Sequence, residues 1–280
     1  MDWSLPKFPL DDLSDDALNW LTVQLSPITR PFSKVLSGWI ETSTTALNTV
    51  PPVITIAVAA LIAWRVAGTR VAILTAAGLA FLLDLRLWEA TMQSLVLVLI
   101  STIVALAIGV PLGIGCALSR RTWQVVSPVL DMGQTLPSFV YLIPAIPFFG
   151  LGPVSASFAT IVFAMPPTIR MTALGIMQVP SELVEASDAF GSTAWQKLAK
   201  VQLPLAAPTI LAGVNQTIML ALSMVVIAAM IGAGGLGGEV WKAIQRLEAG
   251  RGFEAGIAIV ILAIILDRIT QRMARRAHAA

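Results

Sequence analysis

The stretch from Val179 to Pro204 is a polar segment between two apolar ones, and its residue types suit protein binding rather than covalent chemistry. Five of its residues are charged: Glu182, Glu185, Asp188, Lys197 and Lys200. Each charge would cost several kcal/mol in the hydrocarbon of a membrane. We therefore expect this segment to face water.

The spacing within this segment predicts two short helices that meet at a glycine. Pro180 followed by Ser181 is typical of a helix start, and Gly191 interrupts the helical pattern because it permits a turn that a side chain would block. Small residues in the first helix let a groove of another protein approach closely, and an exposed aromatic side chain offers an anchor. The candidate docking residues are Glu185, Ala186, Ser187, Phe190 and Gly191. The alternative is an ordinary solvated loop between two membrane helices.

Motifs for enzymatic chemistry are missing from the sequence. It contains no Gly-Lys pair, hence no phosphate-binding P-loop, and no helix with two histidines or Ser/His/Asp set. The only histidine is His278 and the only cysteine is Cys116, so neither a metal site nor an internal disulfide is expected. We expect no cofactor in this chain.

Composition places the chain in a membrane. Of its 280 residues, 56% are hydrophobic and 12% are charged, and the mean hydropathy is +0.82, whereas about a quarter of the residues in soluble domains are charged. The net charge of +2 is too small to indicate nucleic acid as a partner. The predicted fold class is all-α, a polytopic protein in contact with membrane lipid.

Apolar runs predict about seven transmembrane helices and three regions. Residues 1–50 are expected to form an extracytoplasmic tail with an amphipathic helix on the membrane surface, residues 51–87 a transmembrane hairpin, and residues 88–275 a transmembrane domain with the docking loop at 179–204. The expected spans are Pro51–Ala67, Val71–Leu87, Met92–Leu118, Pro128–Gly150, Val154–Gly175, Pro208–Ile231 and Phe253–Arg272.

The distribution of lysine and arginine predicts the orientation. If the docking loop is cytoplasmic, alternation of seven spans puts the N-terminus outside and the C-terminus inside the cell. The inner segments then carry most of the basic residues, as the positive-inside rule requires. Lys242, Arg246 and Arg251 lie on the outer side, which suggests that they face an acidic external partner, with solvation as the alternative.

Two further patterns suggest a pathway and a gate. Prolines and glycines between Gly133 and Pro167 interrupt two adjacent spans, which is tolerated where helices line a water-filled path. The candidate path residues are Gln134, Ser138, Tyr141, Asn215 and Ser223, each of which could instead bond one helix to another. In the outer loop, Gly234, Gly235 and Gly237 are candidates for a flexible gate. Asp131 and Arg170 are expected to form an ion pair.

Several of these segments together resemble one protein family. The docking loop is similar to the cytoplasmic loop of ATP-binding-cassette (ABC) importer permeases, with Ser187 and Val201 as small departures from the pattern. The runs Gln134–Gly152 (QTLPSFVYLIPAIPFFGLG) and Asn215–Gly237 (NQTIMLALSMVVIAAMIGAGGLG) look like the permease subunits of importers for glycine betaine, proline betaine or choline. The resemblance covers roughly Glu89 to Arg268.

This resemblance implies a type I ABC importer permease fold in the bacterial plasma (inner) membrane. It further implies a homodimer, two copies of a cytoplasmic ATP-binding subunit held by the docking residues Glu185, Ala186 and Gly191, and an extracytoplasmic substrate-binding protein. ATP binding would then switch the path from inward-open to outward-open.

Other functions stay open at this stage. A permease of the same architecture could carry methionine or another small solute, and the sequence does not say which quaternary amine would be transported. A different class, an ion-coupled secondary transporter or an osmotically gated channel, is disfavoured because the span centres carry no Asp, Glu or Arg.

Overall fold

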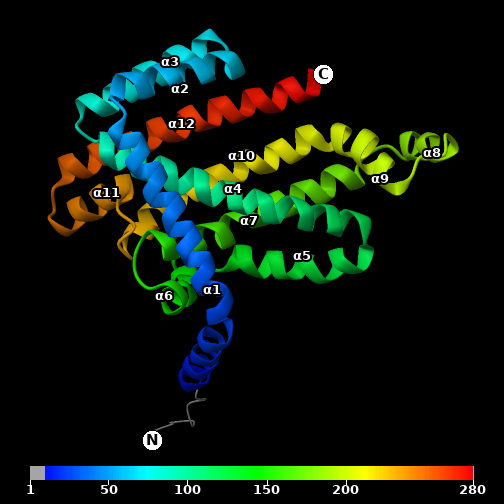
Figure 1. Cartoon of the computed structure of the whole chain (residues 1–280), viewed down its shortest axis with the longest axis horizontal. Helices are drawn as coiled ribbons and strands as arrows, with labels where there is room; N and C mark the ends of the chain where they lie inside the picture. The colour runs from blue at the N-terminus through cyan, green and yellow to red at the C-terminus, as the bar shows by residue number, and fades with distance from the viewer. Residues whose placement is uncertain (1–9, 280) are drawn as a thin grey trace, which may run out of the picture.

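The computed structural model describes residues 10–279, and these residues form helices joined by short connections (Figure 1). Side chains are described for residues 11–273. The first nine residues of the expected N-terminal tail lie outside the described residues. The elements in chain order are α1 (Leu10–Thr49), α2 (Pro52–Ala67), α3 (Thr69–Asp84), α4 (Trp88–Leu118), α5 (Arg120–Thr135), η1 (Ser138–Tyr141), α6 (Leu142–Phe149), α7 (Pro153–Met177), α8 (Ser181–Ala189), α9 (Ala194–Lys197), η2 (Leu198–Gln202), α10 (Leu203–Ala229), α11 (Gly235–Gln245) and α12 (Ala249–Ala279).

Helix α7 is the centre of the bundle and packs against both α4 and α10. Small residues let these helices approach closely: a Cβ atom on Gly113 of α4 would lie 2.6 Å from Thr172 of α7. On the α10 side, a Cβ on Gly213 would lie 2.7 Å from Met171. Close approach at small residues is the usual basis of helix association in membranes, where apolar burial between helices contributes little.

The number of spans differs from the seven expected. Among the described residues, four helices are long and apolar enough to cross a membrane, or up to six if each of two bent helix pairs is one span. The expected hairpin forms, but α2 and α3 have 16 residues each, about 24 Å of helix. That is shorter than the roughly 30 Å thickness of a hydrocarbon core.

The expected span Pro128–Gly150 is broken, as the prolines and glycines within it predict. Helix α5 ends at Thr135, and the chain turns by 112° before it continues through η1 and α6. Leu136 has the extended conformation (φ −71°, ψ 135°) because Pro137 follows it and disfavours helical geometry in the preceding residue. By contrast Pro166 and Pro167, also expected to interrupt a span, lie within the continuous helix α7.

Helix α1 crosses the bundle and contacts α4, α6 and α7 (Figure 1). Leu36 and Ile40 from its expected apolar face are buried against Val96 and Ile100 of α4. Val35 and Trp39, from the same predicted face, remain about half exposed. The amphipathic pattern correctly predicts a helix, and the bundle covers part of the apolar face of α1.

Candidate functional site

The docking segment forms the two short helices that the sequence predicts, and both lie outside the bundle at one end (Figure 1). Helix α8 follows Pro180, has Glu182 in its first turn and contains no buried residue. At its C-terminal end the N–H of Gly191 donates to the carbonyl of Asp188 (2.9 Å) and the N–H of Ser192 donates to the carbonyl of Ser187 (3.2 Å). This pair of hydrogen bonds is a Schellman motif, which ends a helix at a left-handed residue.

Gly191 is that left-handed residue, with φ +74°. A Cβ atom at this position would meet nothing within 4 Å in this chain. The expectation that Gly191 permits a turn that a residue with a side chain disfavours agrees with this φ, and the cause is backbone conformation rather than a clash with a neighbouring group. Glycine is favoured because L-residues rarely adopt this backbone conformation, which costs them about 1–2 kcal/mol.

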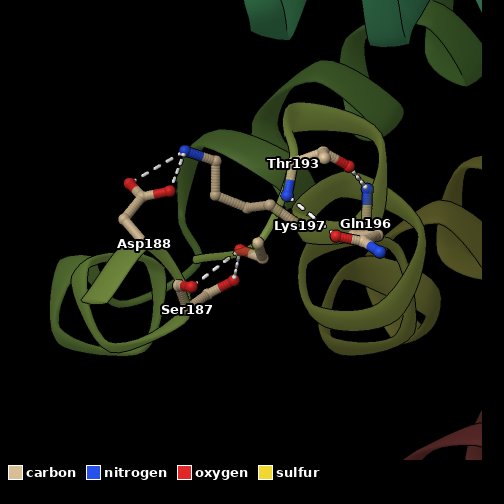
Figure 2. Close-up of polar contacts among 6 residues, drawn as sticks. Ser187, Asp188, Thr193, Gln196 and Lys197 are labelled. Carbon is tan, nitrogen blue, oxygen red and sulfur yellow. Dashed lines mark hydrogen bonds and ion pairs between the residues drawn. The ribbon is translucent and has the colours of Figure 1, made fainter. Parts of the chain in front are cut away.

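Side-chain contacts hold the two docking helices in a fixed relation (Figure 2). The Nζ of Lys197 on α9 lies 2.8 and 2.9 Å from the two carboxylate oxygens of Asp188 on α8. The Ser192 hydroxyl donates to the Ser187 carbonyl (2.7 Å) and also contacts the Ser187 hydroxyl. Helix α9 begins with a capping box between Thr193 and Gln196 (Figure 2).

The outer surface of the docking segment offers apolar anchors. Phe190 is 93% exposed and Trp195 is 72% exposed, and both lie beside the Gly191 turn. Glu185 and Ala186 are exposed as well, whereas Ser187 is partly buried through its contact with Ser192. Trp195 was not among the predicted docking residues. The signal that could have identified Trp195 is an aromatic residue within a short, otherwise polar helix.

Helix α9 continues into the membrane without a break. The π-helix η2 joins it to α10, and the N–H of Leu203 donates to the carbonyl of Leu198 five residues earlier. Pro204, which follows directly, has no N–H to donate to the preceding turn. The docking segment and the bundle are therefore joined by one continuous helix.

The glycines of the expected gate lie at the opposite end of the bundle, at the start of α11 (Figure 1). A Cβ on Gly237 would lie 2.1 Å from the carbonyl oxygen of Val225 on α10, and a Cβ on Gly235 would lie 2.5 Å from Ser94 Oγ on α4. Both glycines are buried. Both glycines permit close packing of α11 against α10 and α4, and the role of these glycines as a flexible gate stays a prediction.

Helix α4 also caps α11. The side-chain oxygen of Gln93 accepts the N–H of Gly235 (2.9 Å), and the Ser94 hydroxyl accepts the N–H of Leu236 (2.8 Å). These bonds satisfy two of the donors that a helix leaves unpaired at its N-terminus. Gly234, with φ +73°, sets the turn into α11 and lines a cavity of about 390 Å³ between α1 and α4.

The candidate path residues fall into two groups. Asn215 is engaged between helices: its side-chain N–H donates to Asp267 of α12 (3.1 Å), and its oxygen accepts from Thr270. Tyr141 donates to the carbonyl of Gly133 across the bend between α5 and η1, and its ring packs edge-on against Phe163.

Gln134 and Ser223 are exposed and Ser138 is partly buried. The Ser223 hydroxyl bonds only to its own helix, at the carbonyl of Met219 (3.0 Å). Exposed polar side chains on apolar helices need a partner other than lipid. Gln134 and Ser223 are therefore the residues of the predicted set that remain available to a second molecule.

The expected ion pair between Asp131 and Arg170 is confirmed. The Arg170 guanidinium donates to the Asp131 carboxylate at 2.6 Å and links α5 to α7. Within the described part of the chain, no three His, Cys, Asp or Glu side chains come close enough together to hold a metal ion.

Basic residues surround a groove between the α3–α4 turn and α11. Lys242 pairs with Glu239 (2.8 Å), and Arg251 pairs with Glu248 (3.2 Å). Arg86 and Arg246 line the same groove of about 250 Å³. Lys242, Arg246 and Arg251 therefore lie around one groove together with Arg86, and two of these four basic residues are already paired within the chain.

The apolar helices form a bundle, and the exposed docking helices lie outside it and continue into α10. This is the architecture of a transport permease that is driven by a separate protein bound to the docking helices. Residues 109–279 match the family described as "Binding-protein-dependent transport system inner membrane component". The chain belongs to this family. It is a multi-pass inner-membrane protein and a transport permease rather than an enzyme.

Known permeases are similar to this chain over most of its length. The chain is 49% identical over 269 residues to the "Glycine betaine transport system permease protein OpuAB" of Bacillus subtilis, covering 96% of this chain and 95% of the relative. It is 46% identical over 271 residues to the "Glycine betaine/proline betaine transport system permease protein ProW" of Escherichia coli, covering 95% of this chain and 75% of the relative. The similarity therefore extends well beyond the Glu89–Arg268 segment in which the sequence alone showed a resemblance.

Solved structures share the fold. The chain superposes on an inward-facing structure of the MetNI methionine ABC transporter with a TM-score of 0.64 and 24% identity, over 68% of this chain and 95% of the other. This confirms the expected type I ABC importer permease fold.

Proposed function

We propose that this chain is the transmembrane permease subunit of an ATP-driven importer for glycine betaine, proline betaine or a closely related quaternary amine. The observation that supports the substrate class is the 46–49% identity, over nearly the whole chain, to permeases whose names specify glycine betaine.

The partners follow from the docking segment. A cytoplasmic ATP-binding subunit would seat its groove on α8 and α9, with Phe190 and Trp195 as anchors and Glu185 and Ala186 beside them. We propose two such subunits, one for each copy of a homodimer. ATP and magnesium would be bound by those subunits and not by this chain.

The second copy of the chain would cover the exposed polar face of α10 and the broken helix α5–α6. Gln216, Met219 and Ser223 recur on one face of α10 and are exposed in the single chain. We propose that this face and Gln134 border the substrate path between two copies. Asn215 and Tyr141 would then hold the walls of the path in place through their contacts within the chain.

Mechanical coupling runs through α10. Closure of the ATPase subunits would displace α8 and α9, and the continuous helix from α9 to α10 would carry the displacement to Val225, where α11 is seated on α10. The alternation between inward-open and outward-open states would be a population shift caused by the affinity of the ATP-bound subunits for one state. The outer groove near Arg86 and Arg246 is the proposed contact for an extracytoplasmic binding protein.

Uptake into proteoliposomes tests the function. Vesicles that contain this chain, its ATPase subunit and its binding protein should accumulate labelled glycine betaine only when ATP is enclosed on the ATPase side. Labelled methionine is the matched control and should not accumulate. Flux through the chain alone would assign it to the ion-coupled transporters or channels instead, and uptake of methionine in place of betaine would overturn the substrate class.

The proposed topology, with the N-terminus outside and the C-terminus inside, has its own test. Ala189→Cys on α8 should react with a membrane-impermeant thiol reagent only from the cytoplasmic side, and Leu247→Cys, at a position that is 91% exposed beyond α11, only from the outside. The native Cys116 is 1% exposed and should not interfere. Labelling of Ala189→Cys from outside would invert the orientation and remove the docking proposal.

A further inference from the structure

A pocket of about 240 Å³ lies between α3 and α12 and is lined by three arginines. Arg70 comes from the first turn of α3, and Arg268 and Arg272 come from the last part of α12. The remaining lining residues are Val71, Leu74 and Gln271. Two segments that are far apart in the chain thus bring three positive charges to one small volume.

The three charges are not neutralised by the part of the chain that the structure describes. None of the three guanidiniums forms an ion pair there. The nearest carboxylate in sequence, Asp267, accepts hydrogen bonds from Asn215 (3.1 Å) and from Gln271 (2.7 and 2.8 Å). Like charges that share a pocket repel one another, and an anion between them would remove this repulsion.

The start of α3 adds a second, independent reason to expect an anion. Its N-cap residue, Gly68, provides no side-chain cap, and its first turn contains no acidic residue. Instead Arg70 lies in this turn, at the end of the helix where the macrodipole disfavours a positive charge. The unpaired N–H groups and the partial positive charge of a helix N-terminus are the features that bind phosphate groups elsewhere.

The surroundings of the pocket are those of a membrane interface. Trp64, at the end of α2, stacks with Arg65 (5.7 Å from guanidinium carbon to ring centroid) beside the α2–α3 turn, and tryptophan is enriched at the boundary between lipid and water. Helix α12 runs from the gate end toward the docking-helix end, and Arg268 follows its apolar stretch (Figure 1).

The faces that carry the arginines continue as exposed apolar surface. Ile73 and Leu74, one turn after Arg70 on α3, are 64% and 38% exposed. Ile264, one turn before Arg268 on α12, is 40% exposed. A soluble anion would not need these apolar neighbours, whereas the acyl chains of a lipid would cover them.

We propose that the pocket of Arg70, Arg268 and Arg272 binds the phosphate headgroup of an anionic phospholipid from the inner leaflet. The guanidinium groups donate to the phosphate oxygens, in the geometry that arginine favours for phosphate. The acyl chains lie along Ile73, Leu74 and Ile264. The lipid thereby ties the α2–α3 hairpin to α12, and this binding does not depend on which solute the protein carries. Basic pockets between membrane helices on the cytoplasmic side are known to hold anionic headgroups.

Lipid titration of the purified full chain, followed by native mass spectrometry, tests the proposal. Dioleoyl phosphatidylglycerol should bind at one site more tightly than dioleoyl phosphatidylcholine. The triple variant Arg70→Gln/Arg268→Gln/Arg272→Gln should bind phosphatidylglycerol about a hundredfold more weakly, because each basic residue near an anionic surface changes the affinity about fivefold. The matched control Arg120→Gln/Arg121→Gln/Lys200→Gln removes the same charge at exposed positions outside the pocket and should bind like the parent chain.

Two results would overturn the proposal. One is equal affinity of the triple variant and the parent chain for phosphatidylglycerol. The other is displacement of phosphatidylglycerol by inorganic phosphate, since the pocket would then be a site for a soluble anion. If the triple variant does not elute as a folded, monodisperse species, the single variant Arg268→Gln replaces it, with an expected loss of about fivefold. A single variant that binds phosphatidylglycerol like the parent chain would contradict the proposal equally.

Discussion

Gly191 offers the sharpest test of how the docking segment works. Its φ of +74° completes the Schellman motif that ends α8, and this motif positions Phe190 and Ser192 on either side of the turn. In Gly191→Ala, the new Cβ would touch nothing within 4 Å in this chain. The physical cost is therefore conformational, about 1–2 kcal/mol for an L-residue in the left-handed region.

That cost converts into a measurable loss of partner binding. If the ATPase subunit binds only the native arrangement of α8 and α9, a penalty of about 1–2 kcal/mol weakens its affinity about 5- to 30-fold, at 1.4 kcal/mol for each factor of ten. The assay is the dissociation constant of the ATPase subunit for the detergent-solubilised chain. Hydrogen exchange at the amides of Gly191 and Ser192 should rise in parallel, since both donate in the motif.

Gly191→Asn is the matched control, because asparagine is larger than alanine but adopts the left-handed conformation more readily. If the backbone conformation at residue 191 determines the affinity, the ATPase subunit binds Gly191→Asn more tightly than Gly191→Ala. If the space left for the partner determines the affinity, the ATPase subunit binds Gly191→Asn more weakly, because the bulkier side chain interferes more. Parent-like affinity in Gly191→Ala would refute the argument that the turn conformation is required.

Three further predictions concern the packing that supports the site. In Gly237→Ala the new Cβ would lie 2.1 Å from the Val225 carbonyl oxygen, so the free energy of unfolding in detergent, measured by thermal melting, should fall by about 1–3 kcal/mol. Gly238→Ala, with open space around its Cβ, should not change it, and equal stability of the two variants would show that α11 does not pack on α10 as described. Ser94→Ala should cost about 1 kcal/mol because it removes a cap of α11. Ser223→Ala, which removes only a bond from an exposed side chain to its own helix, should cost less in the same melting experiment. Asp131→Arg should reduce the yield of folded protein because it places two positive charges together, and the double variant Asp131→Arg/Arg170→Asp should restore the yield. A double variant with no higher yield than the single one would mean that the pair does not link α5 to α7.

The sequence by itself determined the properties that depend on a residue and its near neighbours. The four long apolar helices follow from hydropathy, and the exposure of the docking helices follows from the charges between Val179 and Pro204, since neither depends on which other helix lies nearby. The turn at Gly191 and the break before Pro137 are also local, because they depend on the backbone conformations that glycine and proline allow.

Only the tertiary structure decided what each helix face meets. The sequence does not show what the glycines of α11 contact, and the structure places Gly237 against Val225 and Gly235 against Ser94. From the sequence, the Asn215 side chain could face a path or a neighbouring helix, and in the structure it donates a hydrogen bond to Asp267 of the neighbouring helix α12. Such partners come from helices far apart in the chain, and a periodic pattern of apolar and polar residues specifies a face without specifying what will cover it.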